Sequence, residues 1–407
     1  MTVFVTGINY HSAPLWLRSA MALSDEETGA LMRRATDERG IEECVIVNTC
    51  NRLEVYFTAP DQKAIRAIQD LLSVENDLDP QNTRKYFYFY GDLQAVKHLI
   101  MVACGLDSMV MGETEILGQI KKAHEVARLN GTARTVLNTL FRDSVTAAKK
   151  IKTAVSGPAA PVSIASLAAK RALSFCDRPK ILLVGATGQT GANVLKNLCS
   201  ASNRTILATT RTRKMLYSSD MLYRHPDLTY INYDDRFKAL SEVDVVITAT
   251  SSPHYVFTVR DATPFIDKDR EYLFLDLAVP LDVDTGLSEF ANVVIEDIDQ
   301  FRHLSARNNR LRSKQNKAAL ARIDDYVDRF AKWQIFAQGH DMICELDQRL
   351  RLAGRRMETT DVVHNLIFNV REHASPEEFE VFMRCLSPQI QQRYFPNVTQ
   401  QNKNERA

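Results

Sequence analysis

The sequence contains no apolar run that approaches the about 18 residues needed to span a bilayer. It has no Cys-x-x-Cys pair either, and its seven cysteines are widely spread along the chain. An odd, scattered set of cysteines argues against a disulfide framework and against a structural zinc site. These absences predict a cytoplasmic protein that has no membrane span and binds no metal.

An excess of charge of one sign is also missing. The formal net charge is +1, so the composition carries no signature of nucleic-acid binding, and any RNA partner must be held by a local patch. Residues 1–7 enter a predicted strand directly and lack a basic, apolar, cleavable leader. The 407 residues, of which 45% are hydrophobic and 25% charged, are typical of a globular chain of two or three domains.

A polar stretch at residues 48–52 separates two runs that resemble strands, at 44–47 and 53–57. The second run alternates apolar and polar side chains, as a half-buried strand does, so we expect a hairpin. Its turn would hold Cys50 at the rim of a sheet, where a substrate can reach it. A guanidinium at Arg52 would favour the thiolate, which is the nucleophilic form. A small turn cysteine without chemistry is the alternative that these residues alone leave open.

The first 110 residues alternate predicted strands and helices in the order βαββαβ. Ser24 and Glu27 have the spacing of a capping box, which begins a helix that ends near residue 38. A second helix is expected near 62–75 and an aromatic strand over 86–90. This order predicts a ferredoxin-like split βαβ unit.

Two helices follow this unit. The first, over residues 92–104, has an apolar stripe that includes Leu93. His98 stands off the stripe. It is either an ordinary histidine, on the surface or with its hydrogen bonds satisfied, or a catalytic group. The second helix begins at Thr114 and buries Ile116 on one face. Its opposite, polar face carries Glu115, Gln119 and Lys122, and by pattern alone this face is solvated.

Residues 132–175 are helical and basic in character, and a Gly- and Pro-containing segment at 156–161 interrupts them. The interruption predicts a domain boundary. A basic run of this kind is usually a solvated face, and it becomes a phosphate-contact surface only if the substrate is a nucleic acid.

A buried strand at 181–184 leads into a glycine-rich turn and a helix, and a second strand follows at 205–209. Strand, turn, helix and strand together fit within the ~30 residues of a dinucleotide-binding βαβ unit. The glycines, however, are spaced GxxGxxG and not GxGxxG. Backbone amides at the helix N-terminus would hold a pyrophosphate. The predicted cofactor residues in this turn are Gly185, Ala186, Thr187, Gly188, Gln189, Thr190 and Gly191.

The second strand does not end in the acidic residue that binds a ribose 2′-hydroxyl. It ends in a run of Thr210, Arg211, Thr212, Arg213 and Lys214, which suits a 2′-phosphate, so NADPH is the predicted cofactor. Further strands are expected at 228–231, 243–247, 272–275 and 293–295. Loops at 248–252 and 276–280 follow two of them at carboxyl ends, where a doubly wound sheet binds its ligand; ordinary turn chemistry is the open alternative.

Residues 287–338 contain neither glycine nor proline. A continuous helix of ~35–40 residues here would be too long for one small domain, and it would act as a spine that links units. The tail from 340 to about 394 is amphipathic and helical in pattern, and such modules commonly form dimers.

Four blocks of the sequence, at residues 7–14, 48–56, 105–123 and 276–280, resemble those of the glutamyl-tRNA reductase family. The resemblance covers nearly the whole chain and implies an α/β multidomain fold. It implies a ferredoxin-like α+β catalytic domain that recognises glutamyl-tRNA at 1–157 and a doubly wound, Rossmann-type NADPH domain at 158–297. A spinal helix and an all-helical dimerisation domain would occupy 298–400.

The resemblance implies that Cys50 attacks the ester carbonyl of glutamyl-tRNA, releases the tRNA and keeps the glutamyl group as a thioester. Hydride from NADPH then gives glutamate-1-semialdehyde, at the first committed step of tetrapyrrole synthesis. His98 would act as a general acid or base or orient the ester, and Arg52 would clamp the glutamyl side-chain carboxylate. The other matching recognition positions are Thr49, Asn51, Ser108, Glu113, Thr114, Glu115 and Gln119.

Within this resemblance, Glu113 or Glu115 would take the α-ammonium group, and the partners would be a second copy of the chain and a glutamate-1-semialdehyde aminomutase. Three features depart from the family pattern: Tyr10 replaces a histidine, Leu281 replaces an arginine, and the nucleotide turn is one residue longer. Two alternatives stay open. One is another NADPH-dependent, thioester-forming semialdehyde dehydrogenase, which would normally carry its nucleotide domain first. The other is a non-catalytic tRNA-binding or regulatory relative.

Overall fold

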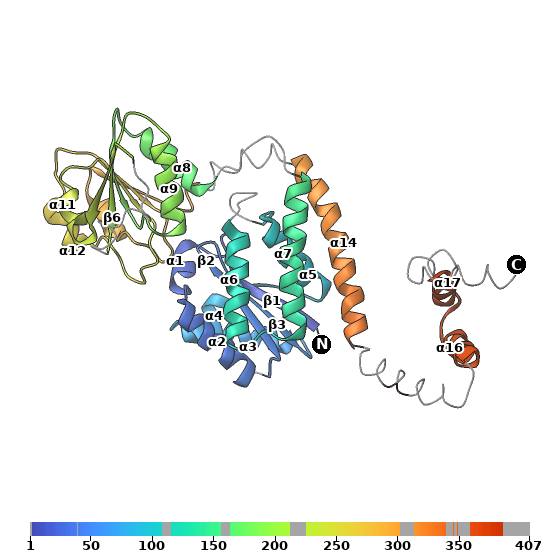
Figure 1. Ribbon diagram of the computed structural model, residues 1–407. Coiled ribbons are helices and arrows are strands. Elements are labelled where there is room, and N and C mark those ends of the chain that lie inside the picture. The colour runs from blue at the N-terminus through green and yellow to red at the C-terminus, as the bar shows by residue number, and fades with distance from the viewer. Residues whose placement is uncertain are drawn as a thin grey trace, which may run out of the picture. The chain divides into compact units, whose positions relative to one another are not determined.

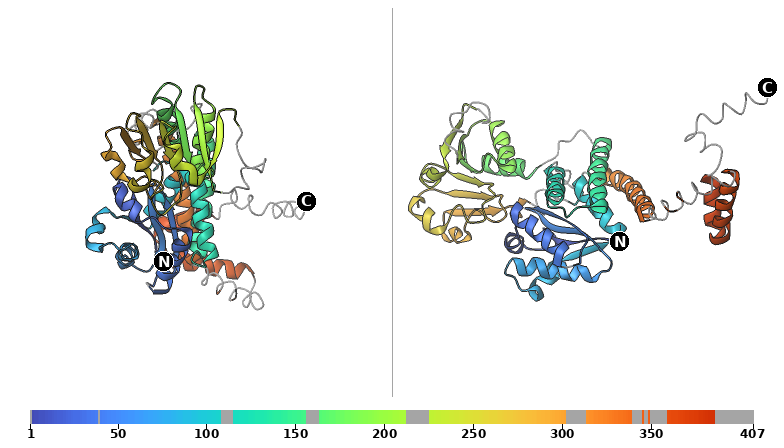
Figure 2. Two further views of the ribbon diagram at one scale, coloured as in Figure 1. Left: turned by 90° about the vertical axis from the view of Figure 1, so that its left-hand side faces the viewer. Right: turned by 60° about the horizontal axis from the view of Figure 1, so that its bottom comes forward.

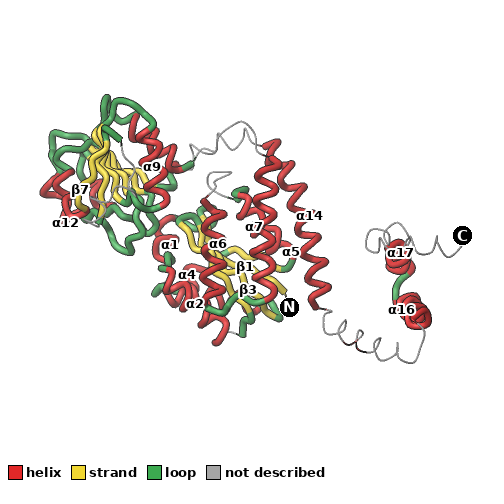
Figure 3. The backbone as a smooth tube through the Cα atoms, in the orientation of Figure 1, coloured by secondary structure: helices red, strands yellow, loops and turns green. Residues whose placement is uncertain are grey.

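The computed structural model describes residues 2–38, 40–107, 115–155, 163–211, 225–301, 313–338, 345, 348 and 359–385. The chain divides into two compact units, Met1–Ala331 and Lys332–Ala407. The first unit contains a four-stranded and a six-stranded sheet (Figures 1 and 3). We call the part built on the first sheet the N-terminal domain and the part built on the second sheet the Rossmann domain. The predicted boundary at 156–161 lies outside the described residues.

The first sheet has the strand order β2-β3-β1-β4, and all neighbouring strands are antiparallel. This order places β1 and β3 side by side at the centre, as the βαββαβ prediction requires, so the ferredoxin-like unit is confirmed. The strands are β1 (Thr2–Asn9), β2 (Glu43–Thr49), β3 (Arg52–Ala59) and β4 (Tyr88–Gly91). The helices are α1 (Leu15–Ala20), α2 (Asp25–Glu38), α3 (Lys63–Glu75) and α4 (Pro80–Thr83), with a 3-10 turn η1 (Arg84–Tyr86) before β4.

The capping box predicted at the start of α2 is present. The Ser24 backbone N–H donates to the Glu27 carboxylate at 2.7 Å, and the Glu27 N–H donates to the Ser24 hydroxyl at 3.2 Å. Each side chain therefore satisfies a backbone group that the first helical turn leaves unpaired.

A layer of three helices packs side by side on the first sheet (Figure 1). They are α5 (Leu93–Cys104), α6 (Glu115–Leu129) and α7 (Thr135–Val155). This layer covers the face of β3 that carries its polar residues; the Tyr56 ring, for example, meets Phe141 of α7 edge to face at 5.4 Å between centroids. All eight residues of β3 are consequently buried, and the expectation of a half-buried strand is wrong.

The second sheet is fully parallel, with the order β10-β9-β8-β5-β6-β7 (Figure 2). From β5 the chain adds β6 and β7 on one side, and then β8, β9 and β10 on the other side. This strand order is that of a doubly wound dinucleotide-binding fold, so the predicted Rossmann-type fold is confirmed. The strands are β5 (Lys180–Val184), β6 (Thr205–Thr210), β7 (Leu228–Asn232), β8 (Val245–Thr248), β9 (Tyr272–Asp276) and β10 (Val293–Asp297). The helices are α8 (Ile164–Leu173), α9 (Gln189–Cys199), α11 (Arg236–Ala239) and α12 (Val259–Ala262), with 3-10 turns η2 (Tyr233–Asp235), η3 (Thr263–Phe265) and η4 (Thr285–Glu289).

Both faces of the second sheet are buried. Ile181 and Leu183 of β5 belong to the apolar cluster that α8 and α9 cover, whereas Leu182 and Val184 belong to a separate cluster on the other face. Two covered faces explain why the predicted strand is continuously apolar rather than alternating.

The long helix α14 (Ser313–Gln338) is 26 residues long, and residues 302–312 before it lie outside the described part. Its described length is thus shorter than the predicted helix. Lys97 of α5 pairs with Asp324 of α14 at 2.7 Å, which ties the helix to the N-terminal domain. The second unit contains α16 (Thr359–His373) and α17 (Pro376–Cys385). Among the described residues, no helix has both the length and the apolar character required to cross a membrane.

Candidate active site

Cys50 lies at the tip of the predicted hairpin, but the turn is tighter than expected. Thr49 at the end of β2 pairs with Arg52 at the start of β3, so only Cys50 and Asn51 link the strands. The Thr49 hydroxyl accepts the backbone N–H groups of Asn51 and Arg52, both at 3.2 Å. Thr49 therefore fixes the turn that presents Cys50, whose side chain is half-buried.

The other cysteines of the N-terminal domain lie in the core. Cys44 is fully buried, and burial raises the pKa of its thiol far above the ordinary value. Burial also raises the pKa of Cys104 to about 11. Thiols held protonated in this way are poor nucleophiles. Cys50 is thus the cysteine of this domain that suits covalent chemistry.

The Cys50 turn contacts the Rossmann domain. Cys50, Leu15 and Tyr10 pack against the apolar cluster formed by α8, α9 and one face of the second sheet. Tyr10, one of the departures from the family pattern, also donates its backbone N–H to the Asn51 carbonyl at 3.0 Å. The proposed nucleophile therefore lies at the junction of the two domains.

Arg18 is the arginine that touches Cys50. Its Nη1 donates to the Cys50 carbonyl oxygen at 2.7 Å, and its Nη2 pairs with Asp299, which follows β10, at 2.5 Å. The side chain is buried. Nothing in the sequence pattern points to Arg18, because its partners lie 32 and 281 residues away along the chain.

Arg52 lies in a different environment. Its side chain is 1% exposed, and its Nη1 contacts Glu54 at 2.6 Å and Asp107 at 3.0 Å. Its Nη2 donates to the Asp107 carbonyl oxygen. Arg52 and Glu54 share one face of β3 because side chains alternate along a strand. The guanidinium is therefore buried in an ion-pair cluster with Glu54 and Asp107.

His98 belongs to the same cluster, and the prediction that it stands off the buried stripe is wrong. It is 8% exposed, whereas Leu93, predicted in the stripe, is 37% exposed. Its Nε2 lies 2.9 Å from the Glu54 carboxylate, and the ring of the partly exposed Tyr90 packs on it at 4.9 Å. The other members of the predicted stripe, Val96, Ile100 and Ala103, are buried as expected. The buried face of α5 is wider than predicted because it also directs His98 at a buried carboxylate of β3, which no local pattern reveals.

Glu54 is the anion that organises the cluster. Burial alone would raise its pKa, but Arg52, His98 and a hydrogen bond from Tyr88 outweigh that effect and hold the pKa well below its ordinary value. The Tyr56 hydroxyl also donates to this carboxylate, at 2.7 Å. An ionised carboxylate only accepts hydrogen bonds, so Nε2 of His98 donates to Glu54, and Nδ1 is the ring nitrogen that this contact does not use.

The spacing of three cluster members resembles that of a metal site. The nearest ligand atoms of Glu54, His98 and Asp107 lie within 4.8 Å of one another. Arg52 already bridges both carboxylates, and a metal ion would have to displace that buried guanidinium. The donor set therefore fits an ion-pair network better than a metal centre.

The predicted recognition residues Ser108, Glu113 and Thr114 lie outside the described residues. Glu115, at the start of α6, accepts a hydrogen bond from Asn193 of α9 in the Rossmann domain. Gln119, one turn further along α6, lines the cavity described next. One end of α6 thus joins the two domains beside the nucleotide turn.

A cavity of about 510 Å³ opens at the carboxyl edge of the second sheet, at the point where the strand order reverses. Of the predicted cofactor residues, six line it: Gly185, Thr187, Gly188, Gln189, Thr190 and Arg211. Ala186 and Gly191 are buried within the turn. Thr209, Thr210, Tyr233, Ala249, Thr250 and Ser251 complete the wall together with Gln119.

The turn is shaped to bring backbone close to a ligand. Gly185 has a φ of +90°, and a Cβ there would lie 2.4 Å from the Ala249 carbonyl oxygen. A Cβ on Gly191 would lie 2.1 Å from the Gly185 carbonyl oxygen. The Thr210 hydroxyl on the wall is buried and has no hydrogen-bond partner among the described residues. A glycine cradle, a helix N-terminus and an unsatisfied hydroxyl fit a dinucleotide.

Arg211 stands at the end of β6, with its guanidinium 4.9 Å from the centre of the Tyr233 ring. Residues 212–214 of the predicted basic cluster lie outside the described part. Across the cavity, Asp282 accepts the backbone N–H and the hydroxyl of Thr250, at 2.9 and 2.5 Å. Burial raises the pKa of Asp282, and the charge of Arg211 is among the effects that oppose the rise.

The loop at 276–280 supports the cavity and does not line it. Asp276 accepts the Thr248 hydroxyl at 3.1 Å and three backbone N–H groups, from Ala278, Asp282 and Val283. Burial raises the pKa of Asp276 to about 7. This carboxyl group fixes the loop that carries Asp282, and Asp282 in turn holds Thr250 in the cavity wall.

A domain that holds a half-buried cysteine at its rim, joined to a Rossmann domain with a cavity shaped for a dinucleotide, is typical of dehydrogenase-type oxidoreductases. Comparison with known families makes this specific. A model described as "Glutamyl-tRNAGlu reductase, N-terminal domain" matches residues 6–155, and one described as "Shikimate / quinate 5-dehydrogenase" matches residues 167–304.

Relatives by sequence that span most of the chain agree with these matches. The chain is 31% identical to a glutamyl-tRNA reductase of Clostridium novyi over 355 residues, which cover 86% of this chain and 84% of that one. It is 33% identical to the enzyme of Geobacillus thermodenitrificans over 341 residues, with 82% and 74% covered. Among solved structures, it is similar to the glutamyl-tRNA reductase of Methanopyrus kandleri (26% identity, 97% and 99% covered, TM-score 0.46). The chain belongs to the glutamyl-tRNA reductase family.

Proposed function

We propose that the protein reduces glutamyl-tRNA to glutamate-1-semialdehyde with NADPH and releases the tRNA, at the first committed step of tetrapyrrole synthesis. The observation that carries the proposal is the position of Cys50, on a two-residue turn that packs against the Rossmann domain. Such a junction is where an acyl group on the sulfur and a reductant in the cavity must meet.

The proposed reaction has two steps. The Cys50 thiolate attacks the ester carbonyl carbon, the bond from that carbon to the ribose oxygen breaks, and the ribose hydroxyl takes a proton. When bound, NADPH supplies the hydride that adds to the thioester carbonyl, after which the thiolate leaves and the aldehyde is free. Cys50 returns to its starting state, and NADP⁺ and tRNA are the other products.

The buried cluster serves the first step. His98, held by Glu54 through Nε2, presents Nδ1 for proton transfer to or from the reacting ester. Arg52 clamps the glutamyl side-chain carboxylate, and Asp107 stands in for that carboxylate in this structure. Asp107 is 23% exposed, so a substrate carboxylate can take its place without leaving the guanidinium unpaired.

We assign NADPH rather than NADH because Arg211, at the end of β6 on the cavity wall, offers a guanidinium that suits a 2′-phosphate. The predicted domains 1–157, 158–297 and 298–400 are retained as part of the proposal. A homodimer formed through the last of these, transfer of the aldehyde to an aminomutase, and a cytosolic location stay predictions.

The test is NADPH oxidation that depends on glutamyl-tRNA. The wild type should oxidise NADPH only with the charged tRNA, and Cys50→Ser should lose essentially all of this rate. Cys199→Ser is a matched control, because Cys199 is a buried thiol of the Rossmann core. If wild type and Cys50→Ser behave alike, the enzyme assignment fails. The runner-up, a thioester-forming semialdehyde dehydrogenase, would instead reduce a small acyl substrate without tRNA.

A further inference from the structure

An exposed aromatic surface lies on the N-terminal domain. Trp16 of α1 is 56% exposed, and its ring meets Tyr86 of η1 at 90° with 6.3 Å between centroids. The Lys85 ammonium lies 5.1 Å from the centre of the Tyr86 ring. Single exposed aromatics are ordinary, but two touching rings with a cation form a patch that suits a specific ligand.

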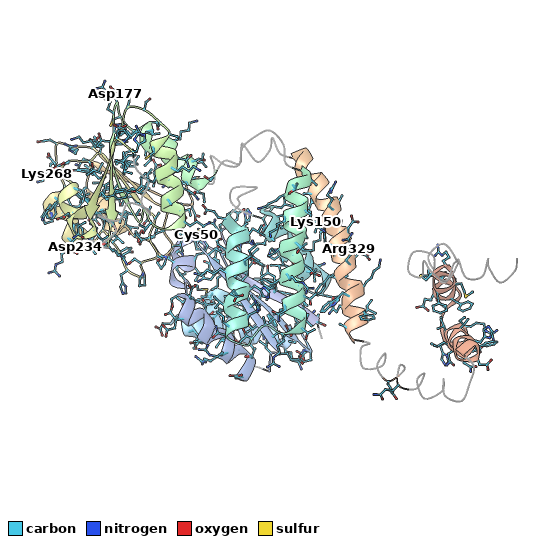
Figure 4. The ribbon with its side chains drawn as sticks, in the orientation of Figure 1. Cys50, Lys150, Asp177, Asp234, Lys268 and Arg329 are labelled. Atoms are coloured by element: carbon cyan, nitrogen blue, oxygen red, sulfur yellow. The ribbon has the colours of Figure 1, made fainter. Side chains whose placement is uncertain are left out.

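This patch is adjacent to the residues that hold Cys50. Within α1, Leu15 packs on the same apolar cluster as Cys50, and Arg18 donates to the Cys50 carbonyl oxygen. Trp16 stands between them in sequence, so the same short helix contacts the turn and carries the exposed ring. Figure 4 marks Cys50 in the orientation of Figure 1, where α1 runs beside it.

The proposed reaction restricts what can lie at this patch. The ester that Cys50 attacks joins the glutamyl group to the ribose of the terminal adenosine of tRNA. During attack, the ester carbon is within bonding distance of the sulfur. The terminal base is only one ribose further away, so it must lie close to the turn. Unpaired bases of RNA are bound most often by stacking on aromatic side chains, and a nearby cation takes the phosphate.

We propose that Trp16 and Tyr86, with Lys85, form a stacking platform for the unpaired 3′ end of the tRNA. Trp16 takes the terminal adenine, and Lys85 contacts a phosphate of the same strand. This inference rests on the proposed function, since it needs an RNA substrate. It also supplies the local patch that a chain of net charge +1 requires to hold RNA.

One test leaves Trp16 intact. The chain has two tryptophans, Trp16 and Trp333, so Trp333→Phe makes Trp16 the sole tryptophan. Uncharged glutamate tRNA with a complete 3′ end should quench its emission, and the same tRNA without its terminal adenosine should quench it far less. Equal quenching by the two RNAs, or none with the intact one, would overturn the platform.

A second test measures affinity. Trp16→Ala should weaken binding of intact tRNA about tenfold, Trp16→Phe should retain most of it, and neither should change binding of the trimmed tRNA. Tyr255→Ala is the matched control, because Tyr255 is an aromatic of similar exposure (46%) on the Rossmann domain. An equal loss for both RNAs would contradict stacking on the terminal base. If the wild type binds neither RNA, the proposed substrate itself is refuted, and the platform with it.

Discussion

Cys50 and Arg52 are two positions apart in sequence, yet their side chains belong to different environments. Cys50 projects from the turn toward the Rossmann domain, whereas Arg52 begins a central strand and is buried under α5 with Glu54. Strand alternation puts Arg52 and Glu54 on one face of β3, whereas the prediction placed Arg52 beside the Cys50 thiolate. The contacts of Arg18 and His98 were not predictable, because they join residues that are distant in the chain.

Glu54→Gln should strongly destabilise the protein, because it leaves the Arg52 guanidinium buried with only one carboxylate. We expect a loss of about 3–5 kcal/mol in the free energy of unfolding, measured with urea. The control is Glu75→Gln, which breaks the exposed pair with Arg34 and should cost less than about 1 kcal/mol. Similar losses in both variants would contradict the buried-cluster account.

The difference in unfolding free energy between the wild type and Glu54→Gln should depend on pH. The folded pKa of Glu54 lies well below its ordinary 4.5, so the folded state binds fewer protons than the unfolded state in the window below that value. Its stabilising effect is therefore complete above about pH 4.5 and declines as the pH falls. The stability difference between wild type and Glu54→Gln should narrow in acid.

Arg211→Ala should weaken NADPH binding far more than NADH binding, because the guanidinium at the end of β6 is assigned to the 2′-phosphate. A loss of tenfold or more for NADPH alone is expected in a fluorescence titration, since charge-assisted hydrogen bonds are worth about 1.5–3 kcal/mol. Arg260→Ala, an exposed arginine on α12, should leave both affinities unchanged. Equal losses of NADPH and NADH would remove the reason for choosing the phosphorylated cofactor.

At the scale of elements, the glycine-rich turn and both sheets follow from local patterns: continuous apolar runs, turn residues and a capping box. The features that these patterns do not predict depend on contacts between residues that are far apart in the chain. β3 is buried on both faces because α5, α6 and α7, which come later in the chain, cover its polar side. The aromatic run at 86–90 begins with the 3-10 turn η1, and only its later part pairs with β1.

The turn between β5 and α9 offers a matched pair of substitutions. In Gly191→Ala the new Cβ would meet the Gly185 carbonyl oxygen at 2.1 Å, and we expect a loss of about 1–3 kcal/mol together with weaker nucleotide binding. In Gly188→Ala the nearest atom is 3.4 Å away, so thermal unfolding without nucleotide should change little. If Gly188→Ala is the more destabilised variant, the packing of this turn is misassigned.

At the scale of the whole molecule, the second unit exposes large apolar side chains. They are Ile335 (70% exposed), Phe336 (61%), Phe368 (53%), Val381 (50%) and Met383 (45%). So many exposed apolar residues in one small unit are typical of a protein interface. They support the dimer proposed for this region, and the sequence pattern of the tail had pointed the same way.

Phe368→Glu should therefore shift the protein toward a monomer, because a buried charge in an apolar interface is unfavourable. Sedimentation velocity at micromolar concentration measures the change. Leu129→Glu is the control, because Leu129 is 79% exposed at the end of α6 in the first unit and should leave the dimer intact. A monomeric wild type would contradict the proposed assembly.

The central claim is that the Cys50 sulfur takes the glutamyl group from the tRNA, and intact-protein mass spectrometry detects this adduct directly. When the protein is mixed with glutamyl-tRNA and NADPH is withheld, a glutamyl adduct should accumulate, and peptide mapping should place it on Cys50. Adding NADPH should remove the adduct and release the aldehyde. A folded protein that stays unmodified at Cys50, with charged tRNA confirmed present, would contradict the account.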